Sequence, residues 1–108
     1  MAIVVVSRWK GSYEQALPIL REASPIMKEV GATSVVAGVC HAGPETSQSL
    51  SLDEIMALPP DLIYTAVTYP DWATFGRVRE NAEFRRVLAE FLKVVEVHDR
   101  SIIEGEEL

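Results

Sequence analysis

Four stretches of the chain have the apolar, β-branched character of strands, and helical patterns lie between them. The predicted strands are residues 2–9, 33–41, 62–69 and 98–104. Valine, isoleucine, threonine and aromatic residues dominate the first three, and such side chains suit a pleated surface. Apolar residues recur at helical spacing after the first strand and again after the third. The predicted order is therefore strand, helix, strand, strand, helix, strand.

The stretch 61–92 is the part around which the other elements are arranged. One face of its strand carries Leu62, Tyr64, Ala66 and Thr68, and the other carries Ile63, Thr65, Val67 and Tyr69. Pro70 ends the strand because proline has no amide hydrogen to donate, and Asp71 is a predicted N-cap. Two apolar stripes follow, the second reaching Val95, and they fall on nearly opposite sides of one straight helix. We therefore predict a break near Asn81, which is itself a good N-cap.

The first helical pattern begins with a capping box, in which Ser12 is the N-cap and Gln15 reaches back from the third position. Pro18 and Pro25 lie inside the pattern and are expected to bend or interrupt the helix, since neither has an amide hydrogen. Pro25 follows a serine, which is typical of the first turn of a new helix. Gly31 is the predicted residue just past the C-terminal end.

The longest connection, residues 42–60, lies between the second and third predicted strands. A second capping box at 51–54 predicts a short helix near residues 52–58. In the strand before this connection, Ala37 and Gly38 are small and leave room for a bulge, or for something bound close to the backbone.

With right-handed crossovers, this order predicts an α+β fold of the ferredoxin-like βαββαβ type, a four-stranded antiparallel sheet with its helices on one face. The 108 residues form a single domain. The first three strands are apolar on both sides, yet the helices can cover only one. An exposed apolar sheet face of several hundred Å² is not expected on a monomer. We therefore predict an obligate homodimer in which two sheets pack face to face.

Composition excludes several classes of partner. The net charge is −6 and the pI is about 4.8, so nucleic acid and anionic membranes are not expected partners. The arginines at 77–86 alternate with glutamates, which is typical of a solvated helix face. Cys40 is the single cysteine, so no internal disulfide can form, which fits a reducing, cytoplasmic location. We expect Cys40 to be a small buried hydrophobic residue. We expect no signal peptide and no membrane span, since no apolar run approaches ~20 residues.

The chain resembles the dimeric α+β barrel proteins, a ferredoxin-like superfamily. The resemblance rests on the strand order, on the proline-broken first helix ending in EVGAT, and on TYPDWATFGRVRENAEFRRVLAEFL. It implies a ligand cleft between the sheet and the helices of each subunit. The superfamily includes cofactor-free antibiotic-biosynthesis-type monooxygenases, haem-degrading enzymes, isomerases and stress-related proteins. The haem-degrading branch uses a helical histidine, and neither predicted main helix of this chain contains one.

His41, at the end of the second predicted strand, is the candidate catalytic residue. An imidazole titrates near neutrality, so His41 could act as a general base or proton shuttle. The plainer interpretation is a partly exposed strand-end histidine. His98 is adjacent to Asp99, but neighbours on a strand point to opposite faces and do not form a dyad.

Aromatic residues are the candidates for binding a flat organic substrate. They are Trp72, Phe75, Tyr64, Trp9 and Tyr69. Trp72 and Phe75 begin the second helical region and could form one wall, while Tyr69 with Arg8 could orient an anionic or phenolic group. For each of these residues the alternative is ordinary core packing.

No metal site or cofactor is predicted. Two histidines and one cysteine without close spacing do not make a zinc or iron centre, and the glycines form no phosphate-binding loop. Two functions remain open. One is a cofactor-free monooxygenase or isomerase acting on an aromatic or polyketide-like compound, and the other is a non-catalytic ligand-binding or structural homodimer. A cavity of a few hundred Å³ with converging polar groups would favour the enzyme.

Overall fold

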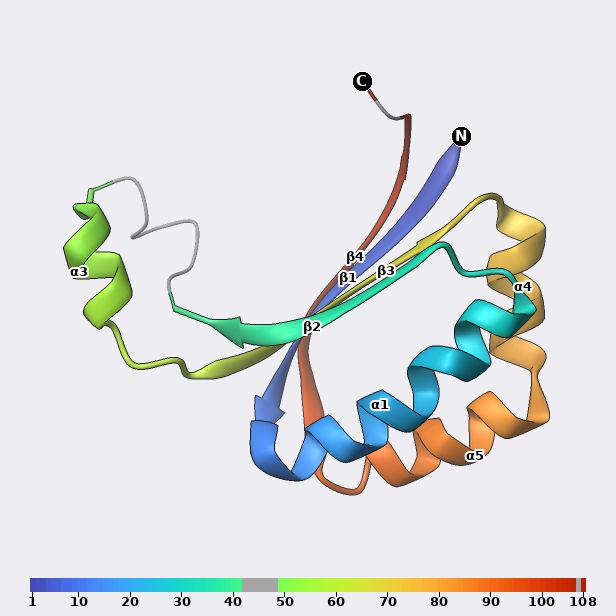
Figure 1. Cartoon of the computed structure of the whole chain (residues 1–108), viewed down its shortest axis with the longest axis horizontal. Helices are drawn as coiled ribbons and strands as arrows, with labels where there is room; N and C mark the ends of the chain where they lie inside the picture. Colours follow the sequence, from blue (N-terminus) through green and yellow to red (C-terminus); the bar gives the residue numbers. More distant parts are fainter. Residues whose placement is uncertain (42–48, 107) are drawn as a thin grey trace.

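The computed structural model describes residues 1–41, 49–106 and 108, and these contain every predicted element (Figure 1). In chain order the elements are β1 (Ala2–Gly11), α1 (Tyr13–Val30), β2 (Ser34–Cys40), α3 (Leu52–Ala57), β3 (Leu62–Tyr69), α4 (Trp72–Glu80), α5 (Ala82–Phe91) and β4 (Val95–Gly105). The sheet order is β2-β3-β1-β4, and all neighbouring strands are antiparallel. The predicted fold is confirmed.

Helices α1, α4 and α5 lie together on one side of the sheet (Figure 1). Helix α3 stands apart at the far end of β2 and β3 and has no buried residue. The opposite sheet face carries exposed apolar side chains, including Val36 at 52% exposure and Ile103 at 47%. Its apolar surface remains in contact with solvent in the single chain.

The strand register decides which side chains face the helices. Ile3, Val5, Ser7 and Trp9 of β1 stand opposite Tyr69, Val67, Thr65 and Ile63 of β3. Six of these eight residues are buried and the two valines are partly buried, so the odd-numbered positions of both strands face the helices. The even-numbered positions, Tyr64 among them, face the other way.

A bulge alters this alternation on β4. Arg8 pairs with Asp99 but Trp9 pairs with Val97, so His98 is an extra residue in the register. Before the bulge in chain order, Val95 and Val97 take the helix-facing side, and Val95 is buried. After it, Arg100 stands opposite Ser7 on the same side.

The predicted helix starts are confirmed. The Ser12 hydroxyl accepts from the Gln15 amide at 3.3 Å, and the Asp71 carboxylate accepts from the Thr74 amide at 2.7 Å. Asn81 ends α4 and caps α5, so the predicted break is present. The capping box at 51–54 is complete in both directions. Gly31 has a φ of 132°, and its amide donates to carbonyls of the last turn of α1.

Two features of the elements differ from those expected. Helix α1 is continuous through Pro18 and Pro25, which are both exposed. The carbonyls that lose a hydrogen bond belong to Glu14 and Arg21, whose side chains are also exposed, so water can replace the missing donors. Strand β4 begins at Val95, which was expected to continue the second helix. The helix ends at Phe91 instead, because the chain must turn to pair with β1.

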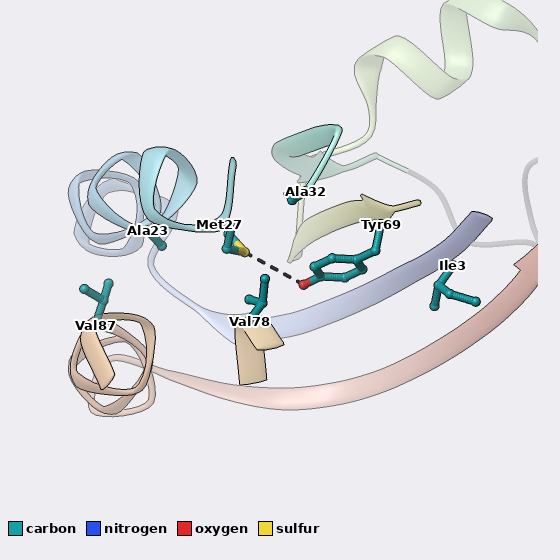
Figure 2. Close-up of a cluster of buried hydrophobic side chains, with 7 residues drawn as sticks. All are labelled: Ile3, Ala23, Met27, Ala32, Tyr69, Val78 and Val87. Atoms are coloured by element: carbon teal, nitrogen blue, oxygen red, sulfur yellow. Dashed lines mark hydrogen bonds between the residues drawn. The ribbon is translucent and has the colours of Figure 1, made fainter. Parts of the chain in front are cut away.

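The buried hydrophobic residues form two clusters. The first contains Ile3, Ala23, Met27, Ala32, Tyr69, Val78 and Val87 (Figure 2). The second contains Trp9, Ala16, Ile63, Phe91 and Val95. Within the described ranges, none of the helices has the length and apolar character that crossing a bilayer would need.

Candidate functional site

A cavity of about 320 Å³ lies between the sheet and the helices and is lined by members of both buried clusters. Strands β1, β2, β3 and β4 contribute to its floor, and α1, α4 and α5 contribute to its roof. Small side chains at Ser7, Ala23 and Ala37 leave this space open. The room expected at Ala37 is therefore present. Space is also open at Gly38, where an added Cβ would meet nothing within 4 Å, but Gly38 stands opposite Tyr64 on the other face of the sheet.

Two edge-to-face aromatic pairs contribute to the apolar wall. The Trp9 and Phe91 rings are 4.9 Å apart at 80°, and the Tyr69 and Phe75 rings are 5.1 Å apart at 88°. All four line the cavity. Aromatic rings in this arrangement hold each other in place, so they present fixed surfaces to a flat ligand.

Hydrogen bonds fix the polar groups of the floor. Trp9 Nε1 donates to Thr65 Oγ1 at 2.9 Å, and Arg100 Nε donates to Ser7 Oγ at 3.0 Å. Ser7 is 2% exposed and Thr65 9%. These buried hydroxyls therefore have partners, as buried polar groups need.

Among the described residues that line the cavity, two arginines carry charge. Arg100 lies 5.2 Å from the centre of the Trp9 ring, and Arg79 lies 5.7 Å from that of Phe75. Both side chains line the cavity and are also exposed, so they lie where the cavity meets solvent. No carboxylate appears among the lining residues of the described part of the chain.

Tyr69 has a buried hydroxyl with a weak partner. Its hydroxyl points at the Met27 sulfur, 4.0 Å away (Figure 2). Burial raises the pKa of Tyr69, and the charge of Arg100 acts in the opposite direction. The phenol is therefore neutral at neutral pH, and its proton is available to a stronger acceptor, since a thioether accepts weakly.

Three of the predicted binding residues, Trp9, Tyr69 and Phe75, line the cavity. Trp72 does not: it is 52% exposed, and its Nε1 donates to Glu104 Oε2 at 2.9 Å. Its ring lies 6.1 Å from that of Phe75. Trp72 therefore supports the aromatic wall from outside.

Tyr64 lies on the opposite face of the sheet and does not line the cavity. It stands across from Arg8, whose guanidinium forms an ion pair with Asp99 on that same face. Arg8 holds the pKa of the Asp99 carboxyl below its usual range. Neither Tyr64 nor Arg8 can orient a ligand between sheet and helices.

His41 also lies outside the cavity lining. It is exposed, and its Nδ1 donates to the Leu58 carbonyl at 3.1 Å, which ties the end of β2 to the end of α3. Cys40, next to it, is partly buried, and burial raises the pKa of its thiol. The described residues contain no group of three or more His, Cys, Asp or Glu side chains placed to hold a metal ion.

Sequence reasoning missed Arg100, Arg79, Ser7 and Thr65. The alternation on β3 already placed Thr65 on the same face as Tyr69. Arg100 could not be found this way, because its partner Ser7 is 93 residues away. Arg79 was assigned to a solvated face, although the same side chain reaches the cavity.

No family model matches the sequence, and no curated protein matches it either. Solved structures do. SnoaB, a cofactor-independent oxygenase from Streptomyces nogalater, superposes with a TM-score of 0.71 at 8% identity, over 99% of this chain and 95% of that one. An antibiotic biosynthesis monooxygenase gives 0.61 at 12%, over 100% and 99%. A conserved protein from Methanosarcina mazei Go1 gives 0.64 at 12%, over 98% and 94%.

The chain has their ferredoxin-like fold. The resemblance that the sequence suggested is confirmed at the level of the fold. Identities this low carry the fold and not the reaction, because one fold hosts many functions. The chemistry of this ferredoxin-like protein must therefore be argued from its own cavity. That cavity offers an apolar slot, a neutral phenol and two guanidinium groups, which together suit a flat, partly polar organic molecule.

Proposed function

We propose that the cavity binds a small aromatic or polyketide-like compound and that the protein is a cofactor-independent monooxygenase. The observation that carries the proposal is the 320 Å³ cavity itself, apolar along its walls and cationic where it meets solvent. Ligand sites typically combine such apolar walls with a few placed polar groups. The oxygenase chemistry of SnoaB, which shares the fold, supports the choice of reaction.

The reaction uses dioxygen and an activated CH₂ group of the substrate. Loss of a proton gives a carbanion delocalised onto a phenolic or carbonyl oxygen. This anion reduces O₂ and forms a C–O bond to it, which gives a hydroperoxide once a proton is taken up. The carbon then loses its second hydrogen as a proton while the O–O bond breaks. One oxygen atom becomes a new carbonyl on the carbon, the other leaves as water, and the carbon is oxidised by four electrons. A guanidinium near the substrate oxygen would stabilise the anion that forms.

The protein's own groups have limited roles in this scheme. Arg100, fixed by Ser7, would stabilise the developing negative charge through its positive charge, and the Tyr69 hydroxyl would donate a hydrogen bond to the substrate oxygen that carries it. The aromatic walls would exclude water from the reacting carbon.

A second candidate is non-catalytic binding of the same class of compound. One observation favours it: no histidine, carboxylate, lysine or cysteine appears in the lining that the described residues form. A binding protein needs no general base, whereas an oxygenase must rely on a substrate acidic enough to lose its proton to water or to a weak base. Binding without turnover would identify this alternative.

We also propose that the protein is a homodimer whose subunits meet through the outer faces of their sheets. The outer face carries apolar side chains, including Val36 and Ile103, and a second copy could cover them through a two-fold interface. The Arg8–Asp99 ion pair on the same face would supply a polar position within that interface.

Oxygen consumption with anthrone tests the enzyme proposal. Anthrone is a tricyclic ketone with an activated CH₂, and with one O₂ it gives anthraquinone and one water. We expect the wild-type protein to accelerate oxygen uptake and anthraquinone formation in equal amounts. Ala37→Phe, which fills the cavity floor, should abolish the acceleration, while Ala89→Phe on the exposed side of α5 should not. Equal rates in both variants would place the reaction outside the cavity.

A further inference from the structure

The charge of the cavity contrasts with the charge of the protein. The chain carries a net charge of −6, yet Arg79 and Arg100 supply cationic groups to the lining, and no carboxylate balances them within the described residues. Neither arginine forms an ion pair with an acidic residue of the described ranges. By contrast, Arg8 and Arg86 pair with acidic side chains on the outer surfaces. An uncompensated cation beside an apolar cavity favours an anionic ligand.

Arg100 is also held in a defined position. Its Nε donates to Ser7 Oγ, which is almost fully buried on β1, and its guanidinium lies over the Trp9 ring. Within the described part of the chain, the two Nη nitrogens have no protein partner. A guanidinium fixed through Nε and an aromatic face thus keeps its Nη end available. Two parallel N–H groups at that end match the two oxygens of a carboxylate.

We propose that the ligand is a monoanion with a flat aromatic body and one carboxylate, and that the Nη groups of Arg100 bind the carboxylate. This inference rests on the proposed function only in using the same cavity, and it names the substrate class. The aromatic body lies between the Trp9–Phe91 and Tyr69–Phe75 pairs. Arg79, over Phe75, adds a second positive charge at the opening and favours entry of the anion.

Equilibrium binding of a matched probe pair tests the inference without any turnover. Naphthoate and its amide, naphthamide, have nearly the same shape but differ in charge. Isothermal titration calorimetry on the wild-type protein should show naphthoate binding about tenfold or more tighter than naphthamide, as charge-assisted hydrogen bonds predict. Ala37→Phe should abolish binding of both, which places the probes in the cavity.

Arg100→Gln should remove the preference, weakening naphthoate about tenfold and leaving naphthamide nearly unchanged. Arg86→Gln is the matched control, because Arg86 lies on the exposed side of α5 and pairs with Glu22. It should leave both affinities as they are. Arg100→Lys keeps the charge but loses the planar fork, so it should retain only part of the preference. Arg79→Gln gives an independent variant if Arg100→Gln does not fold, and it should reduce the naphthoate affinity by a smaller factor.

Equal affinities of the two probes in the wild-type protein would overturn the inference and leave the oxygenase proposal standing. So would an Arg100→Gln variant that weakens both probes alike. Absence of binding by either probe would also count against it. A preference for naphthoate in a protein that consumes no oxygen with anthrone would support the inference and reject the proposed reaction, so the two failures are distinguishable.

Discussion

The indole of Trp9 and the hydroxyl of Thr65 are joined by a 2.9 Å hydrogen bond that runs diagonally between β1 and β3. It connects an aromatic wall of the cavity to its floor. An indole N–H in an apolar environment needs an acceptor, and Thr65 is the acceptor that the fold provides. The bond also sets the orientation of the ring over which Arg100 lies.

Replacing Thr65 with valine keeps the shape and removes the acceptor. We expect Thr65→Val to lower the free energy of unfolding by about 1–3 kcal/mol, because the Trp9 N–H is left buried without a partner. Urea denaturation followed by tryptophan fluorescence measures the change. Thr68→Val, on the same strand but the opposite face, is the control and should change stability less. A Thr65→Val protein as stable as wild type would show that water replaces the hydroxyl.

The N-cap of α4 makes stability depend on pH. The Thr74 amide donates to Asp71, which lowers the pKa of that carboxyl below its ordinary value. A folded-state pKa below the unfolded one means that the cap stabilises the fold above the unfolded pKa. The contribution is lost as the pH falls through the folded pKa. We expect Asp71→Ala to lower the melting temperature by a few degrees at neutral pH and by less in acid.

Asp71→Asn is the matched variant for this effect. Its amide oxygen can still accept from Thr74 but does not titrate. We expect its melting temperature to stay near that of wild type at neutral pH and to lose less on acidification. Parallel acid profiles for wild type and Asp71→Ala would assign the pH dependence to other carboxyls.

His41 and Tyr69 are expected to behave oppositely in the anthrone assay. His41→Ala should leave oxygen uptake unchanged, because the imidazole contacts the Leu58 carbonyl outside the cavity. Tyr69→Phe should lower kcat about tenfold or more, since it removes the hydroxyl proposed to contact the substrate oxygen. Its stability should change little, because the hydroxyl's partner is a distant sulfur. Loss of turnover in His41→Ala would restore the acid–base role that the sequence suggested.

The outer sheet face should determine the assembly. We expect the wild-type protein to sediment at twice the chain mass of 12.0 kDa. Ile103→Lys places a charge on the proposed interface and should shift the protein towards a monomer. Leu92→Lys, at an exposed apolar position after α5, is the control. A wild-type protein that sediments as a monomer at micromolar concentration would remove the dimer proposal.

Local sequence rules predicted the elements well because each had its own signal. Asp71, Asn81 and the capping box at 51–54 mark helix starts through contacts only three residues long. The interruption expected at the prolines of α1 was wrong, since a proline on a solvated helix side costs a hydrogen bond that water can replace. Val95 was misassigned because periodicity alone cannot separate the last turn of a helix from the start of a buried strand.

The site was less predictable, and Tyr64 shows why. Alternation already placed Tyr64 and Tyr69 on opposite faces of one strand, so a single cavity could receive only one of them. Which face the helices cover follows from the tertiary structure. The position of Arg100 depends on strand pairing with Ser7, almost a whole chain length away, and on a bulge that no local sequence pattern predicts.

That bulge shifts the phase of β4 by one position at His98. Val95 and Arg100 are five positions apart, so strict alternation along an unbroken strand would turn them to opposite faces of the sheet. The extra residue brings both side chains to the helix-facing side, where the core receives a valine and the cavity a guanidinium. Regular pairing of the same residues would place one of the two outside. The exposed histidine serves this protein as a spacer.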